Sequence, residues 1–574
     1  MHLQPPPHRL PYRLPLPDLP AALPLYGSHA SRAIEQLAKQ ELARQQLPAH
    51  TLMERAGAAV FRLSAALAPH AHRVWVVCGG GNNGGDGLLA ALAWQQRLQA
   101  LGGEVYVTWL GDASRLPDDA RHALALAQQA GLRWAEQPPD APDLAIDAVF
   151  GIGLAQAVRG AAANACIERL QHLPCPLLCV DLPSGLCADS GNWHAQAAPS
   201  ASPLRHTLSL LTLKPGLFTH HGREASGQIW FDDLGWSALG LQAPAPSAWL
   251  HGCSGAEQVQ AQHTGWAAPL CATTPTAARQ RLHSPHKGTH GSVVVIGGQQ
   301  PGAHGTGMTG AAVLAARAAL RAGAGRVYLG LLGPAPAPGA AAATACAPSA
   351  SRPDTAAATP TAAPLPFDPL QPELMLRPAA ALLHDPLLLQ EAVTVCGCGG
   401  GSAVVPLLAP LLASSPRLVL DADALNAIAT DPALQAQLAA RLDRGWQTVL
   451  TPHPLEAARL LGCSSAQVQA DRLGAAQQLA ERTRSVVVLK GSGSVVAAPG
   501  MVPRLNGSGN ALLASAGTGD VLAGLIGALL ASAAPGLAGA VQASAAAVHR
   551  HGRCADRWPT ERPLLCASDL ITSL

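Results

Sequence analysis

The chain has few charged residues, few aromatic residues and very few lysines. Charged residues make up 13% of its 574 residues and aromatic residues 3%, whereas 48% are hydrophobic. So little charge excludes a disordered polyelectrolyte, and so much apolar material predicts well-buried cores. The net charge is +2 and no run of five or more Lys and Arg residues occurs, so we expect no nucleic acid as a partner.

The sequence also lacks long apolar runs, and its number of cysteines is not even. No uncharged run of 18 or more apolar residues is bounded like a membrane span, so we expect no membrane partner. The first 24 residues are proline-rich and lack the apolar centre of a signal peptide, which argues against secretion. The 13 cysteines are odd in number, and Cys396 and Cys398 have no histidine nearby at metal-ligand spacing. Reduced thiols and a cytoplasmic location are therefore expected.

The length exceeds what one hydrophobic core supports, so at least two domains are predicted. We expect a flexible proline-rich tail over 1–28, an α/β domain over 29–236, a linker rich in Ala, Pro and Ser over 237–283, and a second α/β domain over 284–574. Within the second domain, 24 of the 42 residues in 331–372 are Ala or Pro, which predicts a disordered insertion.

Short apolar runs alternate with helical patterns in both halves, which is typical of a parallel sheet covered by helices on both faces. The first half is predicted to contain strands at 73–78, 104–110, 144–150, 177–181 and 208–213, and helices at 51–68, 86–100 and 117–130. The second half is predicted to contain strands at 292–296, 326–328, 393–396, 417–421, 448–450, 486–489 and 495–497, and helices at 309–322 and 521–532.

A glycine- and asparagine-rich segment follows the first buried strand. Positions 79–87 hold six glycines, two asparagines and one aspartate, more than a tight turn requires. Glycines can reach positive φ and let a ligand approach the backbone closely. Their N–H groups, together with the start of the next helix, can form a concave site for a phosphate.

Two further strand ends point to the same edge of the predicted sheet. Asp147 and Asp181 each end a buried strand, and Ser184 follows shortly after the second. Ligands of open α/β sheets bind outside the carboxyl ends of the strands. Oxygens of Asn, Asp and Ser that converge there would suit a hard monovalent or divalent cation, although helix capping is the alternative role for such carboxylates.

The motifs NNGGDG, DAVFGIG, VDLPSG and LKPG, in this order, resemble the NAD(P)H-hydrate epimerase family, also called the YjeF N-terminal domain, over about 29–235. The resemblance implies a Rossmann-like three-layer fold, interconversion of the R and S epimers of hydrated NADH and NADPH, and a bound potassium ion. It implies that Asn83, Asp147 and Ser184 hold potassium, and that Asp181 binds substrate and is the acid/base at C6 of the hydrated ring. The other substrate-binding residues implied are Asn82, Asn83, Gly84, Gly85, Asp86, Gly151, Ile152, Gly153, Leu154, Ala155, Gln156 and Ala157.

A second cluster of motifs lies near the C-terminus. Only four lysines occur (Lys39, Lys214, Lys287 and Lys490), and the last three fall in glycine-containing motifs, so each is a candidate site. The segment from Lys490 to Ser494 follows a strand, and AGTGD, which ends at Asp520, precedes an apolar helix. The N–H groups at that helix start can hold a phosphate, and Asp520 stands where a general base would meet a hydroxyl, although an N-cap is the alternative role.

With HKGTHG at 286–291, DADALN at 421–426 and TPHPLE at 451–456, these motifs resemble the ADP-dependent NAD(P)H-hydrate dehydratase family over about 284–574. The resemblance implies a ribokinase-like three-layer fold and dehydration of the S epimer with ADP and magnesium, releasing AMP and phosphate. It implies that Ala311, Gly399, His453 and Asp520 contact the hydrate, with Asp520 as base. The nucleotide-binding residues implied are Lys490, Gly491, Ser492, Gly493, Ser494, Asn510, Gly517, Thr518 and Gly519. Three positions depart from the family motifs: Cys398 and Gly400 stand at the proline and leucine of its GPGLG, and Leu455 stands at the glycine of its TPHPGE.

Together the two resemblances predict a bifunctional metabolite-repair enzyme, an isomerase and a hydro-lyase, that acts on small-molecule substrates and forms a homo-oligomer. One alternative is a ribokinase-like small-molecule kinase fused to a nucleotide-binding domain, because such folds share the GTGD arrangement. HKGTHG, TPHPLE and the fused first domain favour dehydration. The other alternative is a nucleotide-sensing or scaffold protein with decayed sites, and the presence of Asn83, Asp181, Lys490 and Asp520 argues against it.

Overall fold

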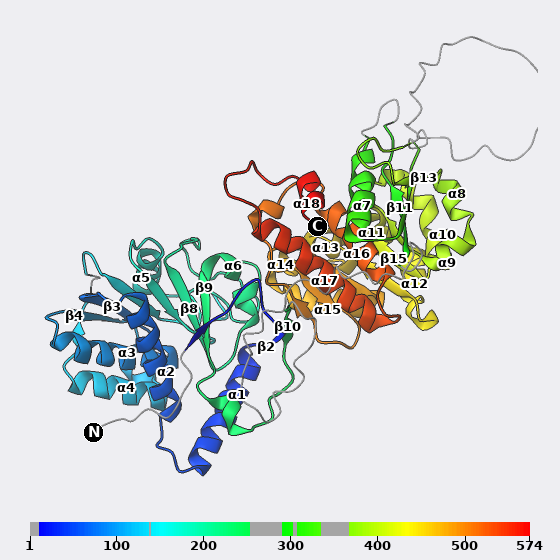
Figure 1. Cartoon of the computed structure of the whole chain (residues 1–574). Helices are drawn as coiled ribbons and strands as arrows, with labels where there is room; N and C mark the ends of the chain where they lie inside the picture. The colour runs from blue at the N-terminus through cyan, green and yellow to red at the C-terminus, as the bar shows by residue number, and fades with distance from the viewer. Residues whose placement is uncertain (1–10, 137–138, 253–289, 302–306, 334–366) are drawn as a thin grey trace, which may run out of the picture.

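The computed structural model describes residues 11–136, 139–252, 290–301, 307–333 and 367–574. These residues form two α/β domains that lie side by side, the first from α1 to β9 and the second from β11 to the C-terminus (Figure 1). The predicted α/β class with helices on both faces of each sheet is therefore confirmed. Among the described helices, none has the length and apolar content needed to cross a membrane.

The first sheet has eight strands in the order β1-β9-β8-β7-β6-β3-β4-β5. The strands are β1 Tyr12–Arg13, β3 Arg73–Cys78, β4 Glu104–Trp109, β5 Arg133–Trp134, β6 Leu144–Ala148, β7 Leu177–Val180, β8 Arg205–Leu210 and β9 Gln228–Asp232. All neighbours from β9 to β5 are parallel, and β1 is antiparallel to β9. The continuous apolar runs of β3 and β6 follow from burial of both sheet faces.

Helices cover both faces of this sheet. They are α1 Ser28–Arg44, α2 Thr51–Leu67, α3 Asn82–Gln99, α4 Asp118–Gln129, α5 Ala161–Gln171 and the short α6 Gly222–Ala225. The first four pack with Val74 and Val76 of β3 in one apolar cluster, whereas α5 packs with Trp75 and Val77 in another. Alternate residues of one strand therefore belong to opposite layers, as the period of a strand requires.

The second sheet has eleven strands in the order β13-β12-β11-β14-β15-β16-β17-β18-β19-β10-β2. The strands are β2 Leu23–Leu25, β10 Ala248–Leu250, β11 Ser292–Gly297, β12 Arg326–Leu331, β13 Met375–Leu376, β14 Ala392–Cys396, β15 Arg417–Leu420, β16 Gln447–Leu450, β17 Val486–Leu489, β18 Val495–Ala497 and β19 Arg504–Leu505. The strands from β13 to β17 are parallel, and β18 and β19 continue the sheet antiparallel.

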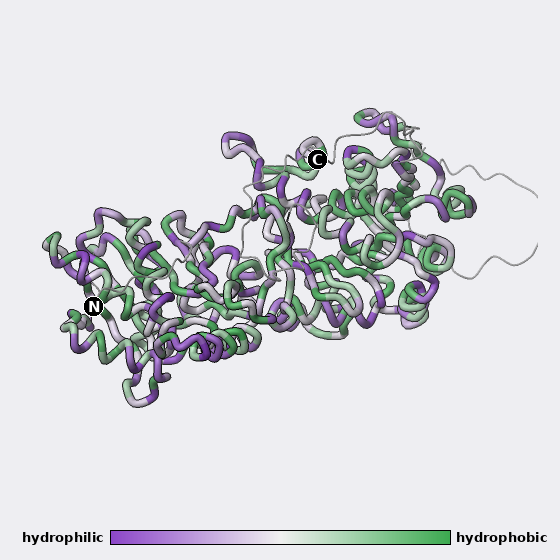
Figure 2. The backbone as a smooth tube through the Cα atoms, turned by 60° about the horizontal axis from the view of Figure 1, so that its bottom comes forward, coloured by the Kyte–Doolittle hydropathy of each residue, from purple (hydrophilic) through white to green (hydrophobic). Residues whose placement is uncertain are grey.

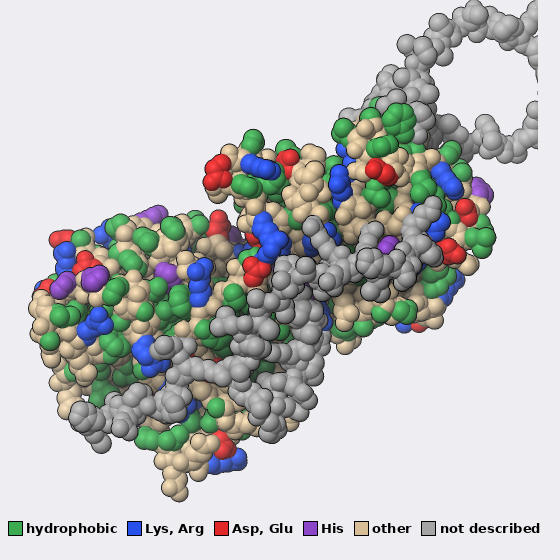
Figure 3. Space-filling view, viewed as in Figure 1, with side chains coloured by type: hydrophobic (Ala, Val, Ile, Leu, Met, Phe, Trp, Pro, Cys, Tyr) green, Lys and Arg blue, Asp and Glu red, His purple; other side chains and the backbone are tan. Residues whose placement is uncertain are grey.

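Helices also cover this sheet on both faces. One face carries α7 Thr309–Ala322, α16 Thr518–Ala531, α17 Leu537–Asp556 and α18 Ala567–Ser573. The other carries α8 Ala379–Leu383, α9 Pro386–Glu391, α10 Val405–Ser414, α11 Ala422–Thr430, α12 Pro432–Ala439, α13 Pro454–Leu461, α14 Ser465–Ala470 and α15 Arg472–Thr483. Figure 2 shows that hydrophobic and hydrophilic stretches alternate along the chain in both domains. On the face drawn in Figure 3, Lys and Arg side chains are scattered among acidic and apolar ones and form no continuous basic surface.

Two of the predicted segment boundaries are wrong. Residues 11–28 were expected to be part of a flexible tail, yet β1 pairs with β9 and β2 pairs with β10. The region 237–283 was expected to be a linker, yet β10 lies within it and joins the second sheet; 1–10 and 253–283 lie outside the described residues. The N-terminal segment is ordered because the leucines between its prolines, Leu14, Leu19, Leu23 and Leu25, are buried in the core. Pro24 is tolerated within β2 because β2 is an edge strand.

These two segments also tie the domains together. The bridge between Leu25 and Leu213 connects β2 of the second sheet to the first domain. Leu25 and Phe218 belong to the same apolar cluster as Leu250 and Leu505 of the second sheet. The two domains therefore share part of one core rather than being joined only by a linker.

The predicted insertion 331–372 is described only at its ends, because 334–366 lie outside the described residues. Arg317 donates to both carboxylate oxygens of Asp368 at 2.6 Å, which fixes the chain at the far end.

Replacing 334–366 by a short Gly/Ser bridge should leave the melting temperature nearly unchanged, because loop entropy varies slowly with length. Deleting all of 331–372 also removes the Arg317–Asp368 pair and should lower it by several degrees. Thermal unfolding of both variants tests this, and insoluble protein after the shorter deletion would show that the segment packs against the core.

Two candidate active sites

The helix after the first buried strand starts earlier than the sequence predicts. Helix α3 begins at Asn82 rather than at Asp86, so Asn82 to Gly85 form its first turn. None of the six glycines from 79 to 87 has a positive φ, which corrects the expected reason for them. A side chain at Gly84 would instead overlap the Gly79 carbonyl, and a Cβ at Gly87 would lie 2.5 Å from the Cβ of Ala148. These glycines are needed for close packing of α3 against the sheet.

A cavity of 720 Å³ opens at the carboxyl ends of β3, β6 and β7. This is where open α/β sheets bind ligands. Among the predicted substrate residues, those that line it are Asn82, Asn83, Asp86, Gly151, Ile152, Gly153, Leu154 and Asp181. Gly84 and Gly85 are buried in α3, and Ala155, Gln156 and Ala157 are exposed outside the lining. The structure thus brings together the residues of three separate motifs.

Asp181 is held in an unusual backbone conformation with one carboxylate oxygen anchored. Its φ is +66°, in the left-handed region that few non-glycine residues adopt. Oδ1 accepts hydrogen bonds from Lys214 Nζ and, at 3.2 Å, from Leu210 N. Lys214 is 2% exposed, and burial lowers the pKa of its ammonium. In the described part of the chain no hydrogen bond reaches Oδ2 of Asp181, and the side chain lines the cavity, as acid–base chemistry requires.

The three residues predicted to hold potassium lie around the end of β6. Ser184 donates through Oγ and N to the two oxygens of Asp147, at 2.5 and 2.9 Å, and accepts from Phe150 N at 2.9 Å. Burial raises the pKa of Asp147. Asn83 lies against Gly151, where a Cβ would be 3.2 Å from its Oδ1, and its amide nitrogen has no partner among the described residues. The donor atoms are mainly oxygens, which fit a hard cation.

Charged residues from helices α1 and α4 complete the cavity wall. Lys39 lies 2.7 Å from both Glu35 and Asp119. Burial, then the charges of Asp181 and Glu35, raise the pKa of Asp86 well above its ordinary value. No role for Glu35 or Asp119 is predicted from the sequence. The one feature that could have drawn attention to them is the rare lysine Lys39, with which both form ion pairs.

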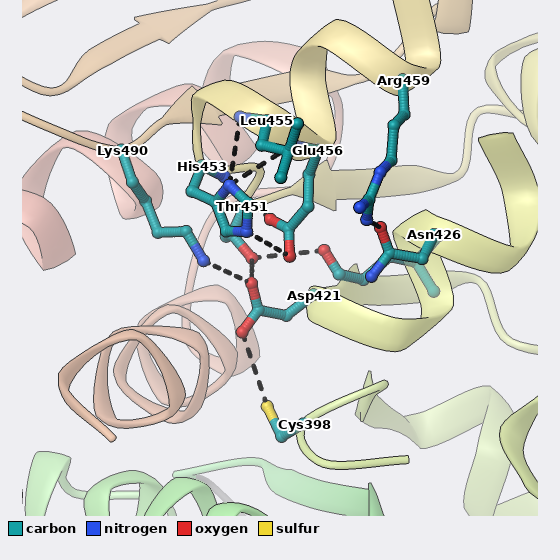
Figure 4. A network of polar contacts seen from close by, with 10 residues as sticks. Cys398, Asp421, Asn426, Thr451, His453, Leu455, Glu456, Arg459 and Lys490 are labelled. Atoms are coloured by element: carbon teal, nitrogen blue, oxygen red, sulfur yellow. Dashed lines mark hydrogen bonds and ion pairs between the residues drawn. The ribbon is translucent and has the colours of Figure 1, made fainter. Parts of the chain in front are cut away.

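The second site gathers the ends of β15, β16 and β17 (Figure 4). Asp421 Oδ1 accepts from Lys490 Nζ and from Thr451 Oγ1, each at 2.7 Å. Burial by itself would lower the pKa of Lys490, but the negative charges of Asp421 and Glu456 outweigh it and raise the pKa. Lys490 therefore stays an ammonium in this buried position.

Asp520 lies in the first turn of α16, beside Lys490. The helix begins at Thr518, and Gly517, with φ +85°, occupies the N-cap position. The alternative that Asp520 is an N-cap is therefore wrong. Burial, with the charge of Asp421, raises the pKa of Asp520 to about 6. A Cβ on Gly519 would lie 3.4 Å from Lys490 Nζ, so the ammonium stands at the N-terminus of α16, where a phosphate can bind.

His453 has a clear structural role as the N-cap of α13. Its Nδ1 accepts from the backbone N–H groups of Leu455 and Glu456 at 3.1 and 3.3 Å, and its Nε2 lies 3.2 Å from Glu456 Oε1. Burial, then the nearby Lys490, lowers the pKa of His453. Leu455, where the family has glycine, is half exposed on a regular helix without positive φ, so a side chain fits.

The remaining residues predicted to bind the hydrate or the nucleotide have mainly structural contacts. Gly399, with φ +58°, packs against Ala311, whose Cβ would lie 2.8 Å from a Cβ at Gly399. Thr518 Oγ1 donates to two backbone carbonyls at 2.9 Å. Asn510 caps a short 3-10 turn and donates to Asp556 Oδ1 at 3.3 Å. Lys287 and most of HKGTHG lie outside the described residues.

The segment after Lys490 contacts the first domain. Ser492 exchanges hydrogen bonds of 3.0 Å with the backbone of His220, and a side chain at Gly493 would overlap the Phe218 carbonyl. Arg472, which is fully buried, donates to Gly493 O at 3.2 Å and to Thr219 Oγ1 at 3.1 Å. Arg472 could not be singled out from the sequence, because an arginine in a helical pattern usually faces solvent.

Comparison with known proteins agrees with this two-domain arrangement. The family described as YjeF-related protein N-terminus matches residues 49–216, and the family described as NAD(P)H-hydrate dehydratase matches 293–574. The bifunctional NAD(P)H-hydrate repair enzyme Nnr of Escherichia coli (strain K12) is 35% identical over 548 residues, which cover 92% of this chain and 89% of that protein. The ADP-dependent (S)-NAD(P)H-hydrate dehydratase of Neisseria meningitidis serogroup B is 39% identical over 287 residues, 49% of this chain and 82% of that protein.

Among solved structures, a ribokinase-like superfamily protein from Enterococcus faecalis V583 matches with 21% identity and a TM-score of 0.38, covering 51% of this chain and 88% of that one. The two family matches follow each other along the chain in the order of the two domains. The relative from Escherichia coli matches across nearly the whole chain. The chain therefore belongs to the family of bifunctional NAD(P)H-hydrate repair enzymes.

Proposed function

We propose that the chain repairs hydrated NADH and NADPH in two steps. The first domain interconverts the R and S epimers, and the second dehydrates the S epimer with ADP, giving NAD(P)H, AMP and phosphate. The observation that carries the proposal is the cluster of the buried Asp421 with the partly buried Lys490 and Asp520 at the N-terminus of α16. The name of the relative from Escherichia coli supports a bifunctional repair enzyme, and that of the relative from Neisseria meningitidis supports ADP-dependent dehydration of the S epimer.

In the second site, a phosphate group of ADP would lie at the N-terminus of α16 and against Lys490. The N–H groups of the first turn and the ammonium would stabilise the charge that develops during phosphoryl transfer. Asp520 would accept the proton of the hydrate hydroxyl as this oxygen takes the phosphoryl group. The C–O bond would then break and release phosphate, while the adjacent ring carbon loses a proton to water and the double bond forms. Asp421 anchors Lys490 for this role. Magnesium would accompany the ADP phosphates.

In the first site, Asp181 would exchange a proton with the hydrated ring in the cavity. Lys214 keeps one of its oxygens fixed, and the buried amide nitrogen of Asn83 would donate to the substrate. A potassium ion held by Asn83, Asp147 and Ser184 would supply a fixed positive charge to this buried region.

Incubation of the full chain with mixed epimers of hydrated NADH and ADP tests the proposal through NADH absorbance. We expect NADH to form from both epimers, in an amount limited by ADP. No NADH in the presence of ADP would contradict the proposal. Phosphorylation of a hydroxylated small molecule by ATP, without NADH formation, would favour the kinase alternative.

The rate of dehydration should depend on pH through Asp520. Its pKa of about 6 means that it is protonated, and unable to accept a proton, in more acidic solution. The initial kcat/KM for the S epimer should therefore be level above about pH 7 and fall roughly tenfold per pH unit below about 6. Initial rates between about pH 5 and pH 8 measure this. The same decline in the residual rate of Asp520→Asn would assign the dependence to another group.

A further inference from the structure

A thiol stands beside the proposed base of the second domain. Cys398 follows β14, at the second position of the segment that resembles GPGLG, where that motif has proline. Its side chain is buried, and its Sγ lies 3.8 Å from Asp421 Oδ2. One ligand atom each of Cys398, Asp421 and Asp520 lie within 4.8 Å of one another. A sulfur and two carboxylates thus converge on one buried point.

Asp421 is oriented so that one oxygen remains available to this point. Its Oδ1 accepts from Thr451 and Lys490, whereas Oδ2 faces the sulfur of Cys398 (Figure 4). Hydrogen bonds to the outer oxygen of a ligating carboxylate are what orient metal ligands in proteins. The positions of Asp421 and Thr451 are therefore already those of a ligand and its supporting partner.

The charges balance when a divalent cation is added. A thiolate and two carboxylates carry three negative charges, and Lys490 supplies one positive charge. A doubly charged cation brings the sum to zero, which a buried position favours. A thiolate selects a soft or borderline ion such as Zn²⁺, whereas Mg²⁺ requires about six oxygen ligands.

We propose that Cys398, Asp421 and Asp520 form an inhibitory site for a thiophilic divalent cation of the Zn²⁺ class. Ideal Zn–S and Zn–O lengths are about 2.3 and 2.0–2.2 Å in a tetrahedron, so the three ligand atoms need to close in by roughly 1 Å. On binding, the thiol gives its proton to solvent and forms the S–metal bond. The fourth position is open to water or to a phosphate oxygen.

The expected inhibition of dehydration by the bound cation rests on the proposed function of Asp520 as base. A cation that takes the carboxylate of Asp520 removes the proton acceptor of dehydration, so the second activity is blocked. The cavity of the first domain contains none of these three residues. Epimerisation should therefore continue while the cation is bound.

The site is tested in the full chain, freed of metal by a chelator and titrated with Co²⁺, whose bond to a thiolate gives a charge-transfer band in the ultraviolet. Cys398→Ala is compared with Cys396→Ala, which removes an equally buried thiol two residues away that is not in the cluster. We expect the buried-site band in the wild type and in Cys396→Ala, its loss in Cys398→Ala, and its displacement by Zn²⁺. Asp520→Asn should weaken binding by about tenfold or more.

A second measurement reports the consequence. With Mg²⁺ in excess, Zn²⁺ should stop NADH formation from pure S epimer in the wild type, and a chelator selective for Zn²⁺ should restore it. Cys398→Ala should need about tenfold more Zn²⁺ for half inhibition. An unchanged band in Cys398→Ala, or equal half-inhibiting Zn²⁺ concentrations, would overturn the site. A chain that binds Co²⁺ through Cys398 but forms no NADH from S epimer, ADP and Mg²⁺ when Zn²⁺ and Co²⁺ are absent would instead overturn the proposed function and leave the site standing.

Discussion

Asp520→Asn should lower kcat for dehydration by about 10²–10⁴-fold, because it removes the proton acceptor and keeps the shape of the side chain. The fold should be unaffected. Gly517, not Asp520, occupies the N-cap position of α16, so the substitution removes no cap. Burial raises the pKa of Asp520 to about 6, which means that this position disfavours a charged carboxylate. A neutral amide in the same position therefore has a smaller desolvation cost and should not destabilise the fold.

The measurement is NADH formation from pure S epimer at saturating ADP, with thermal unfolding and epimerisation recorded on the same protein. Asp423→Asn is a matched control. It removes a nearby carboxylate whose Oδ2 accepts from Gly401 N at 2.8 Å and which is not in the cluster with Asp520. We expect it to lose less than about tenfold in rate. Near-normal dehydration by Asp520→Asn would exclude Asp520 as the base.

Asp181→Ala should abolish R-to-S conversion and leave dehydration of pure S epimer intact. With mixed epimers and ADP, NADH should form in a fast burst from the S fraction and then slowly, at the rate of spontaneous epimerisation. The wild type should continue toward complete conversion. The reason is that the substitution removes the proposed acid/base from the cavity of the first domain only.

The structure shows why a second variant is needed at this position. Asp181 pairs with the buried Lys214, and loss of one partner of a buried pair costs about 3–5 kcal/mol. Its φ of +66° also suits Asp and Asn better than Ala. Asp181→Asn keeps a hydrogen-bond acceptor for Lys214 and the backbone conformation, although it also removes the negative charge. It should give the same two phases and a higher melting temperature than Asp181→Ala. A second phase equal to that of the wild type in both variants would leave Asp181 with a structural role only.

These rates should be measured over a range of ADP concentrations, because the sites are less separate than the sequence suggests. The chain runs from Lys214 to Thr219 and His220, which contact Ser492 in the predicted nucleotide-binding segment. If the KM for ADP in Asp181→Asn equals that of the wild type, the two sites work independently, as predicted. A raised KM would show that a change at Asp181 reaches the second site through these contacts.

The sequence by itself determined the core strands and the ends that carry the candidate residues. Predicted strands at 73–78, 486–489 and 495–497 coincide with β3, β17 and β18. Helices cover both faces of these strands, so their residues form continuous apolar runs that can be recognised without knowing which strands are their neighbours. Asp181, Lys490 and Asp520 could be singled out because each follows such a strand or begins a helix.

Only the tertiary structure decided how distant segments use these residues. Leu25 joins the second sheet from the far end of the chain, and Gly84 and Gly87 at the start of α3 allow this helix to pack against Gly79 and Ala148. Cys398 meets Asp421 and Asp520 although neither is its neighbour in sequence. A local apolar pattern tells whether a residue is buried but not what it is buried against, because that depends on which strand ends and helix faces meet in the folded chain.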